Sequence, residues 1–181
     1  DKNYFIISTN ADGQLEKSDF DKNKIFSMQG NYGYLQCMTP CTDEIYESEE
    51  YIKKMTKSIE NNRVSMDTLP RCPHCGNYLI PNLRCDDTFV EKPHMKNSEK
   101  YRDFLRENIN KNILFLELGV GYNTPVIIRY PFEKMTYNLD KSTLARVNKG
   151  MATVSKEIED KSISLDEDIN KVLLDVIKNM N

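Results

Sequence analysis

The chain has 181 residues, enough for one domain with a core of its own or for a core that carries a small inserted module. Charged residues make up 29% of the sequence, the formal net charge is -3, and no long basic run occurs. Phosphate contact requires a clustered basic face, so we expect no nucleic-acid partner. No apolar run is long enough for a transmembrane helix, and we expect no membrane partner.

The cysteine count and the first residues indicate a compartment and a boundary. Five cysteines are an odd number, and no apolar signal segment opens the chain, so we expect a cytoplasmic location. Residues 4–7 already have the pattern of a buried strand, with no helix or cap before it. We therefore expect this chain to be the carboxyl-terminal portion of a larger domain.

Four of the cysteines form two pairs with the spacing of metal ligands. The pairs lie in C-M-T-P-C and C-P-H-C, and their members are Cys37, Cys41, Cys72 and Cys75. Four thiolates fill the tetrahedral shell of Zn²⁺ and leave no position for a substrate, so the expected ion is structural. Two disulfides are the alternative. His74 is expected to face solvent, and Cys85 to be half-buried outside the shell.

The first predicted element is a strand at residues 4–8, followed by a polar loop at residues 9–13. A second polar stretch, residues 28–33, leads into the first cysteine pair. Apolar residues between the two pairs recur with a 3.6-residue period, which predicts a helix packed on the zinc module. These residues are Ile45, Ile52, Met55 and Ile59.

After the second pair, short extended pieces are expected at residues 78–81 and 88–91. Asn97 has the residue type of a helix N-cap and predicts a helix that begins there. A buried strand is expected at residues 113–118, and Glu117 within it is expected at an edge or an interface.

The last part of the chain predicts two more helices and one more strand. Pro125 fits the first turn of a helix. A strand at residues 144–147 ends at Asn148, and Asp166 is expected to open a final amphipathic helix.

Strands that alternate with helices and end in polar loops predict an α/β fold. We expect part of a Rossmann-like, doubly wound parallel sheet with an inserted zinc-ribbon module. The Rossmann-like parts are expected at residues 1–31 and 82–181, and the zinc ribbon at residues 32–81. Ligands collect at the carboxyl ends of such strands, so the loops around Asn10, Gly119 and Asn148 are expected to line one groove.

Taken in order, these motifs resemble those of the sirtuins, the NAD-dependent protein deacylases and ADP-ribosyltransferases. T-N-A-D-G from Thr9 is similar to the family's Q-N-I-D-G, and M-Q-G-N from Met28 occupies the place of its H-G motif. The four cysteines follow where the family has its zinc ribbon, and residues 81–91 resemble its R-P-x-V-x-F-G-E segment. Gly119-Val120-Gly121 stands in for G-T-S, and Val147-Asn148-Lys149 resembles the I-N strand end.

The main departure is Gln29, which stands where deacylases of the family have a catalytic histidine. Glutamine takes no proton near neutral pH, although it can orient a ribose hydroxyl. This substitution resembles the macrodomain-linked class M sirtuins of microbes. That resemblance implies a protein ADP-ribosyltransferase whose acceptor is a lipoylated carrier protein and whose partner is a macrodomain protein. It also implies an upstream Gly-rich segment for the NAD pyrophosphate.

The resemblance assigns roles around two cofactors, NAD and Zn. Asn10 would contact the nicotinamide ribose, Asp12 the departing nicotinamide, and Gln29 a ribose hydroxyl. Cofactor contacts are implied for Thr9, Asn10, Asp12, Gly119, Gly121, Asn148 and Lys149. The alternative for Asn10 and Asp12 is an Asx turn, that for the two glycines is a tight turn, and that for Asn148 is a cap.

Two other functions remain open from the sequence. The same fold could serve as an NAD-dependent deacylase, which Gln29 disfavours. A zinc-ribbon interaction module without catalysis would need only the four cysteines, and it leaves the polar strand ends unexplained.

Overall fold

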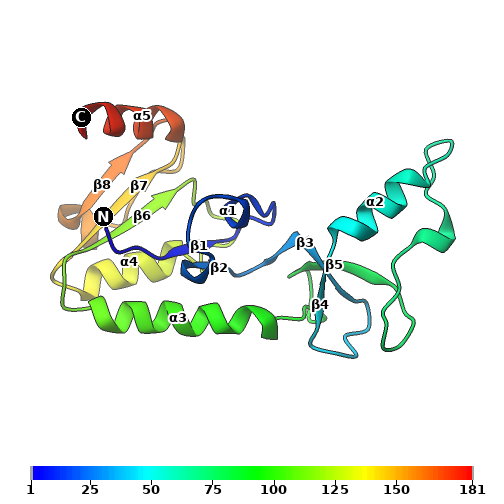
Figure 1. The fold of residues 1–181 in the computed structure, drawn as a ribbon. Helices are drawn as coiled ribbons and strands as arrows, with labels where there is room; N and C mark the ends of the chain where they lie inside the picture. The colour runs from blue at the N-terminus through cyan, green and yellow to red at the C-terminus, as the bar shows by residue number, and fades with distance from the viewer. Residues whose placement is uncertain (1, 181) are drawn as a thin grey trace. The chain divides into compact units, whose positions relative to one another are not determined.

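A computed structural model describes residues 2–180 (Figure 1). The chain divides into two compact units, Asp1–Asp103 and Phe104–Asn181, which are described separately below. The division falls within one helix. None of the helices in the described part is long and apolar enough to cross a membrane.

The amino-terminal unit begins with two short parallel strands, β1 (Ile6–Ser8) and β2 (Ile25–Ser27). Helix α1 (Gln14–Lys17) and the 3₁₀ turn η1 (Lys22–Lys24) lie between them in the chain. The predicted strand at residues 4–8 is therefore present, with its carboxyl end as expected. Because the strands are parallel, their carboxyl ends lie at one edge, and a polar loop leaves each of them.

A three-stranded antiparallel sheet follows, with β3 (Gly30–Cys37) between β4 (Ile45–Glu47) and β5 (Leu79–Leu83). Gly30 has φ +71°, and a Cβ on it would lie 2.1 Å from the Asn82 carbonyl oxygen. Glycine thus permits β3 to approach β5 at this point. Residues 88–91 form a loop, where the sequence predicted an extended piece.

The helix predicted between the cysteine pairs is shorter than expected. Helix α2 (Glu49–Lys57) holds Ile52 and Met55, but Ile45 lies in β4 opposite Gln36, and Ile59 follows the helix. The strand takes Ile45 because β3 offers it a hydrogen-bonding partner that is distant in sequence. Helix α2 packs on the core of the cysteine module through Tyr51. A 3₁₀ turn, η2 (Met66–Thr68), precedes the second cysteine pair.

Helix α3 (Lys92–Asn108) begins five residues before the predicted start at Asn97. Pro93 fits its first turn, where a missing N–H has no consequence. Asn97 does not cap this helix. Its Nδ2 donates to the Ile25 carbonyl at 2.8 Å instead.

The carboxyl-terminal unit holds a parallel sheet in the order β6 (Ile113–Leu118), β7 (Ser142–Val147) and β8 (Ser162–Leu165). Helix α4 (Arg129–Asn138) and the 3₁₀ helix η3 (Lys156–Lys161) supply the crossovers, and α5 (Ile169–Met180) ends the chain. The parallel sheet with its helices confirms the predicted α/β class. The division at residues 31 and 81 stays a prediction.

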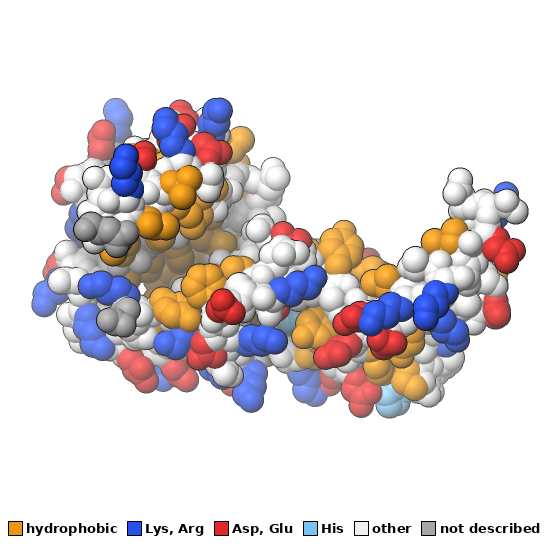
Figure 2. All heavy atoms as spheres, turned by 45° about the horizontal axis from the view of Figure 1, so that its top comes forward, with side chains coloured by type: hydrophobic (Ala, Val, Ile, Leu, Met, Phe, Trp, Pro, Cys, Tyr) orange, Lys and Arg blue, Asp and Glu red, His pale blue; other side chains and the backbone are white. Residues whose placement is uncertain are grey.

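One face of this sheet forms the core of the unit. Phe115, Leu144 and Ile158 are buried there, and Phe132 of α4 packs on them with its ring centroid 4.9 Å from that of Phe115. The alternate β6 residues Leu114, Leu116 and Leu118 are exposed. Figure 2 shows in orange the hydrophobic side chains that reach one face of the surface.

Two predicted helix starts shift in this unit. Pro125 opens a turn, and α4 begins at Arg129, with Pro131 in its first turn. Asp168 rather than Asp166 caps α5, since its Oδ1 accepts from the Lys171 amide at 3.1 Å.

Candidate functional site

The four paired cysteines converge on one point in the amino-terminal unit. Cys37 ends β3, and Cys72 lies in the turn before β5, where its amide donates to the Asn77 carbonyl at 2.7 Å. Both are buried with Leu35 and Leu79, whereas Cys41 and Cys75 are exposed. The hydrophobic core next to the cysteine cluster is therefore formed by side chains of β3 and β5, the strands that adjoin the cysteines.

The sulfur positions fit a tetrahedral metal site. All four sulfurs lie within 4.8 Å of one another, and Cys37 Sγ lies 3.5 Å from Cys75 Sγ and 3.7 Å from Cys41 Sγ. Bonds of about 2.3 Å from Zn²⁺ to each sulfur would separate the sulfurs by about 3.8 Å. The cysteines are free thiols, which contradicts the alternative of two disulfides.

The cluster favours ionisation at one position and disfavours it at another. Burial raises the pKa of the Cys37 thiol, but hydrogen bonds from the Thr39 hydroxyl and the Cys41 amide outweigh it and lower the pKa to about 6. The adjoining Cys75 sulfur, burial and the Cys72 sulfur raise the pKa of Cys41 to about 12. Four thiolates this close require a cation to balance them, and this donor set is one that zinc prefers.

The two residues expected outside the shell lie outside it. His74 is exposed, and its Nε2 lies 2.8 Å from Glu44 Oε2. Cys85 does not belong to the sulfur cluster, but it is exposed rather than half-buried, because it lies in the loop after β5.

The T-N-A-D-G loop follows β1, as predicted. Asn10 is exposed, and its amide donates to Ser8 Oγ at 3.0 Å. Asp12 makes the Asx turn that was the alternative interpretation, because its Oδ1 accepts from the Gln14 amide at 3.0 Å. Thr9 is half-buried.

The turn that contains Gln29 lies beside this loop. The Met28 amide donates to the Ser8 carbonyl at 3.0 Å, and the Tyr32 amide donates to the Ala11 carbonyl at 2.9 Å. The structure thus brings together, within one unit, the segments that carry Asn10, Asp12 and Gln29.

Arg84, which the sequence did not single out, also holds the Gln29 turn. Its amide donates to the Gln29 carbonyl at 3.1 Å, and its Nε donates to the Met28 carbonyl at 3.3 Å. The Arg84 guanidinium also lies 2.6 Å from Glu91 and over the ring of Phe89. A residue 55 positions downstream of its contact gives no local sequence signal.

A buried polar network fixes the loop that follows β5. Gln36 Oε1 accepts from Asn82 Nδ2 at 2.7 Å and from the Val90 amide at 2.9 Å, while its Nε2 donates to the Thr88 carbonyl. Asn82 Oδ1 lies 2.8 Å from His94 Nε2. The amide nitrogen of Asn82 already donates twice, so the oxygen accepts and His94 carries its proton on Nε2. Burial, and then nearby Arg84, lower the pKa of His94.

In the carboxyl-terminal unit, the predicted residues lie at the carboxyl ends of β6 and β7. The Gly119 amide donates to the Val147 carbonyl at 3.0 Å, and Asn148 Nδ2 donates to the Val120 carbonyl at 2.9 Å. Gly119 has φ +71°, a left-handed backbone conformation that favours glycine. Gly121 lies in the same loop, and Lys149 is exposed.

Glu117 lies on β6, an edge strand of this three-stranded sheet, as predicted, but its charged side chain is buried. It is 1% exposed on the core face of β6, where Arg146 of β7 lies directly opposite. Arg146 Nε lies 2.6 Å from Glu117 Oε2, and its Nη1 lies 2.8 Å from Glu133 Oε1. The charged side chains are buried because they neutralise one another.

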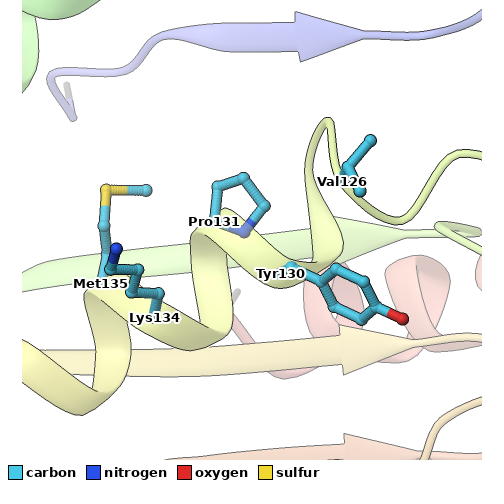
Figure 3. A pocket seen from close by; sticks show the side chains of 5 residues that line it. All are labelled: Val126, Tyr130, Pro131, Lys134 and Met135. Atoms are coloured by element: carbon cyan, nitrogen blue, oxygen red, sulfur yellow. The ribbon is translucent and has the colours of Figure 1, made fainter.

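A pocket lies at the beginning of α4 and takes one lining residue, Val126, from the loop after β6 (Figure 3). It is lined by Val126, Tyr130, Pro131, Lys134 and Met135, none of which is a candidate nucleotide residue.

Several solved structures have a fold similar to that of this chain. A solved structure of a study of sirtuin substrate affinity superposes with a TM-score of 0.57 at 19% identity, over 97% of this chain and 64% of that one. A sirtuin homologue bound to a myristoylated histone peptide gives 0.54 at 16% identity, over 96% and 63%. A mutant Sir2 homologue in complex with ADP-ribose gives 0.53 at 12% identity, over 97% and 59%. The fold is that of the sirtuins.

Two proteins of known name are similar to this chain in sequence. A "Protein ADP-ribosyltransferase" of Staphylococcus aureus is 29% identical over 180 residues, which cover 98% of this chain. A "Probable bifunctional ADP-ribose hydrolase/ADP-ribosyltransferase" of Fusarium oxysporum is 32% identical over 88% of the chain. The chain spans 57% of the first relative's length and 28% of the second's. No family model matches the chain. Sequence and fold together fit a member of the sirtuin family.

Proposed function

We propose that this chain is the part of an NAD-dependent protein ADP-ribosyltransferase that carries the reacting groups for nicotinamide release. The observation that carries the proposal is the Gln29 turn, which lies beside the T-N-A-D-G loop in a chain whose two curated relatives are named ADP-ribosyltransferases. A glutamine at this point can orient a hydroxyl but cannot deprotonate it. This difference favours transfer over deacylation.

In the proposed reaction, the bond between C1′ of the ribose and the nicotinamide nitrogen breaks, and nicotinamide leaves with the electron pair. A nucleophile of the acceptor protein forms the new bond to C1′ and loses its proton to solvent. Positive charge develops on the ribose, so oriented polar groups stabilise the transition state. The exposed amide side chain of Asn10 is the group proposed to face this ribose.

Asp12 and Gln29 complete the nicotinamide end. Asp12 Oδ1 is used by the Gln14 amide, so a contact with the departing carboxamide falls to Oδ2. Gln29 lies in a turn that Arg84 holds by two contacts to backbone oxygens, and its amide would orient a ribose hydroxyl. Gly119, Gly121, Asn148 and Lys149 would hold the adenosine end, as the resemblance implies.

The proposed metal is a structural zinc ion on Cys37, Cys41, Cys72 and Cys75. The sulfur separations and the burial of two ligands in the core of the module support it. With four sulfur ligands, the ion would stabilise the fold and take no part in transfer.

The acceptor is proposed to be a protein. A lipoylated carrier protein as that acceptor, and a macrodomain protein as a partner, stay predictions from the resemblance. The name of the fungal relative, which joins an ADP-ribose hydrolase to an ADP-ribosyltransferase, is compatible with such a pairing.

The test is an assay of the full-length protein with NAD labelled in its adenosine part. We expect label on a lipoylated acceptor and one nicotinamide released for each ADP-ribose transferred. An acetyl-lysine peptide in the same assay tests the deacylase alternative. Efficient release of the deacetylated peptide, with no labelled protein, would contradict the proposal.

A further inference from the structure

The Arg129 side chain is almost fully buried, at 1% exposure, yet it donates mainly to backbone oxygens of two loops. In the loop after β6, Nη1 donates to the Val120 carbonyl at 3.2 Å, and Nη2 donates to the Tyr122 hydroxyl at 2.9 Å. In the segment after β7, Nη1 donates to the Met151 carbonyl at 3.1 Å, and Nη2 donates to the Thr153 carbonyl at 2.6 Å. A single guanidinium therefore links the two loops.

Arg146 reinforces this link from the sheet. Its Nη1 donates to the same Thr153 carbonyl at 2.6 Å, while its other donors bind Glu117. Glu133 of α4 lies 2.8 Å from Arg146 and 3.9 Å from Arg129. The cluster thus contains two arginines and two glutamates, and its charges balance.

Stability alone does not account for such a cluster. Apolar residues of similar volume usually stabilise a core as well as a buried ion pair does, because ions must be desolvated. A guanidinium differs from them in fixing several acceptors at once through its planar set of donors. What the cluster supplies is a defined distance between the loop after β6 and the loop after β7.

These loops are the ones that carry the proposed adenosine contacts. Asn148 donates to the Val120 carbonyl, which also accepts from Arg129, and Gly121 lies between Val120 and Tyr122. A change in the hydrogen bonds to the Val120 carbonyl would therefore shift the positions of Gly119, Gly121 and Asn148.

We propose that Arg129 is a positioning residue, which holds the loops after β6 and β7 at the spacing that the adenosine end of the dinucleotide requires. It acts through the backbone and does not touch the nucleotide. This inference rests on the proposed function, and it adds a residue to which neither motif nor spacing pointed.

The test compares Arg129→Lys with a matched control in the full-length protein. Lys161 is the control, because its Nζ also donates to two backbone carbonyls, those of Thr136 and Leu139, but away from both loops. We expect Arg129→Lys to raise the Kd for ADP-ribose and the KM for NAD about tenfold, as the loss of one strong interaction would. Its kcat at saturating NAD should stay within about twofold. Lys161→Met should lower Tm with both constants unchanged.

A milder variant covers the case in which Arg129→Lys does not fold. Tyr122 is half exposed, and its ring lies 4.1 Å from the Arg129 guanidinium. Tyr122→Ala should weaken ADP-ribose binding in the same direction, whereas Tyr137→Ala, on the exposed side of α4, should not.

Hydrogen exchange gives a readout that needs no ligand. Amides of residues 119–122 and 151–153 should exchange faster in Arg129→Lys and not in Lys161→Met. Unchanged exchange and unchanged ADP-ribose affinity in Arg129→Lys would overturn the positioning role alone. A wild-type protein that binds neither NAD nor ADP-ribose would overturn the proposed function together with it.

Discussion

Arg146 and Glu117 face each other across neighbouring parallel strands, with Nε and Oε2 2.6 Å apart and both side chains withdrawn from solvent. Removal of Glu117 leaves two buried arginines, Arg129 and Arg146, to share the single carboxylate of Glu133, so one buried positive charge is no longer balanced. Glu117→Ala should therefore lower the free energy of unfolding by about 3–5 kcal/mol. Urea denaturation would measure it.

A double-mutant cycle separates this coupling from packing. Glu117→Leu with Arg146→Met should cost less than the sum of the single variants, because neither charge is then left alone. Additive losses would show that the pair contributes no coupling.

Cys72→Ser tests the metal cluster. Zinc binding and folding are coupled, so this variant should lose the ion and expose residues 37–79 to protease while the parallel sheet persists. Zinc content by atomic spectroscopy and limited proteolysis measure the two effects. Cys85→Ser, outside the cluster, is the control and should retain both properties. Equal zinc content in the two variants would contradict the assignment.

Asn10 and Gln29 should differ in their importance for transfer. Asn10→Ala removes the polar group proposed to face the reacting ribose, and a loss of about a hundredfold in kcat is expected. Gln29→Ala should cost less, since glutamine would only orient a hydroxyl. Single-turnover nicotinamide release with saturating NAD measures both. A larger loss at Gln29 than at Asn10 would reverse the proposed roles.

His94 should make the stability of the amino-terminal unit depend on pH. Its pKa in the folded state lies below the unfolded value of about 6.5, mainly because of burial, so folding favours the neutral ring. The stability that His94 contributes is fully present above about pH 6.5 and is lost as the pH falls through the lowered pKa. Denaturation midpoints between about pH 7.5 and 5 should fall less in His94→Asn than in the wild type.

The second histidine of the chain provides the control for that measurement. His74 is exposed and pairs with Glu44 at the surface. His74→Asn, measured over the same pH range, provides the profile of a variant that lacks an exposed histidine and keeps His94. A profile of His94→Asn that overlays the wild type would exclude His94 as the source.

The sequence predicted those elements whose signal is local. The continuous apolar run of β6 gave its bounds, Ile113–Leu118, without error. Strand β8 was missed because S-I-S-L is short and half polar, and it is a strand only through its pairing with β7. Asn97 was misread because its amide binds the Ile25 carbonyl, 72 residues away in sequence.

The candidate site likewise contains residues that the sequence predicted and residues that it did not. The cysteine pairs and the loops after β1, β2, β6 and β7 were found from motifs. Arg84, His94 and Arg129 were not, because their partners lie far along the chain or are backbone atoms. The edge-strand position of Glu117 was predicted, but its burial was not, because its partner Arg146 lies on the next strand, 29 residues away in sequence.

Gly30 limits how this sequence can diverge. Its positive φ and the Asn82 carbonyl, 2.1 Å from a hypothetical Cβ, exclude every side chain at that point, whereas Gly76 and Gly150 have nothing within 4 Å of such an atom. The pairing of β3 with β5 begins at Gly30, directly after Gln29. The fold therefore tolerates substitution at position 29, which is proposed to contact the ribose, but it requires glycine at position 30.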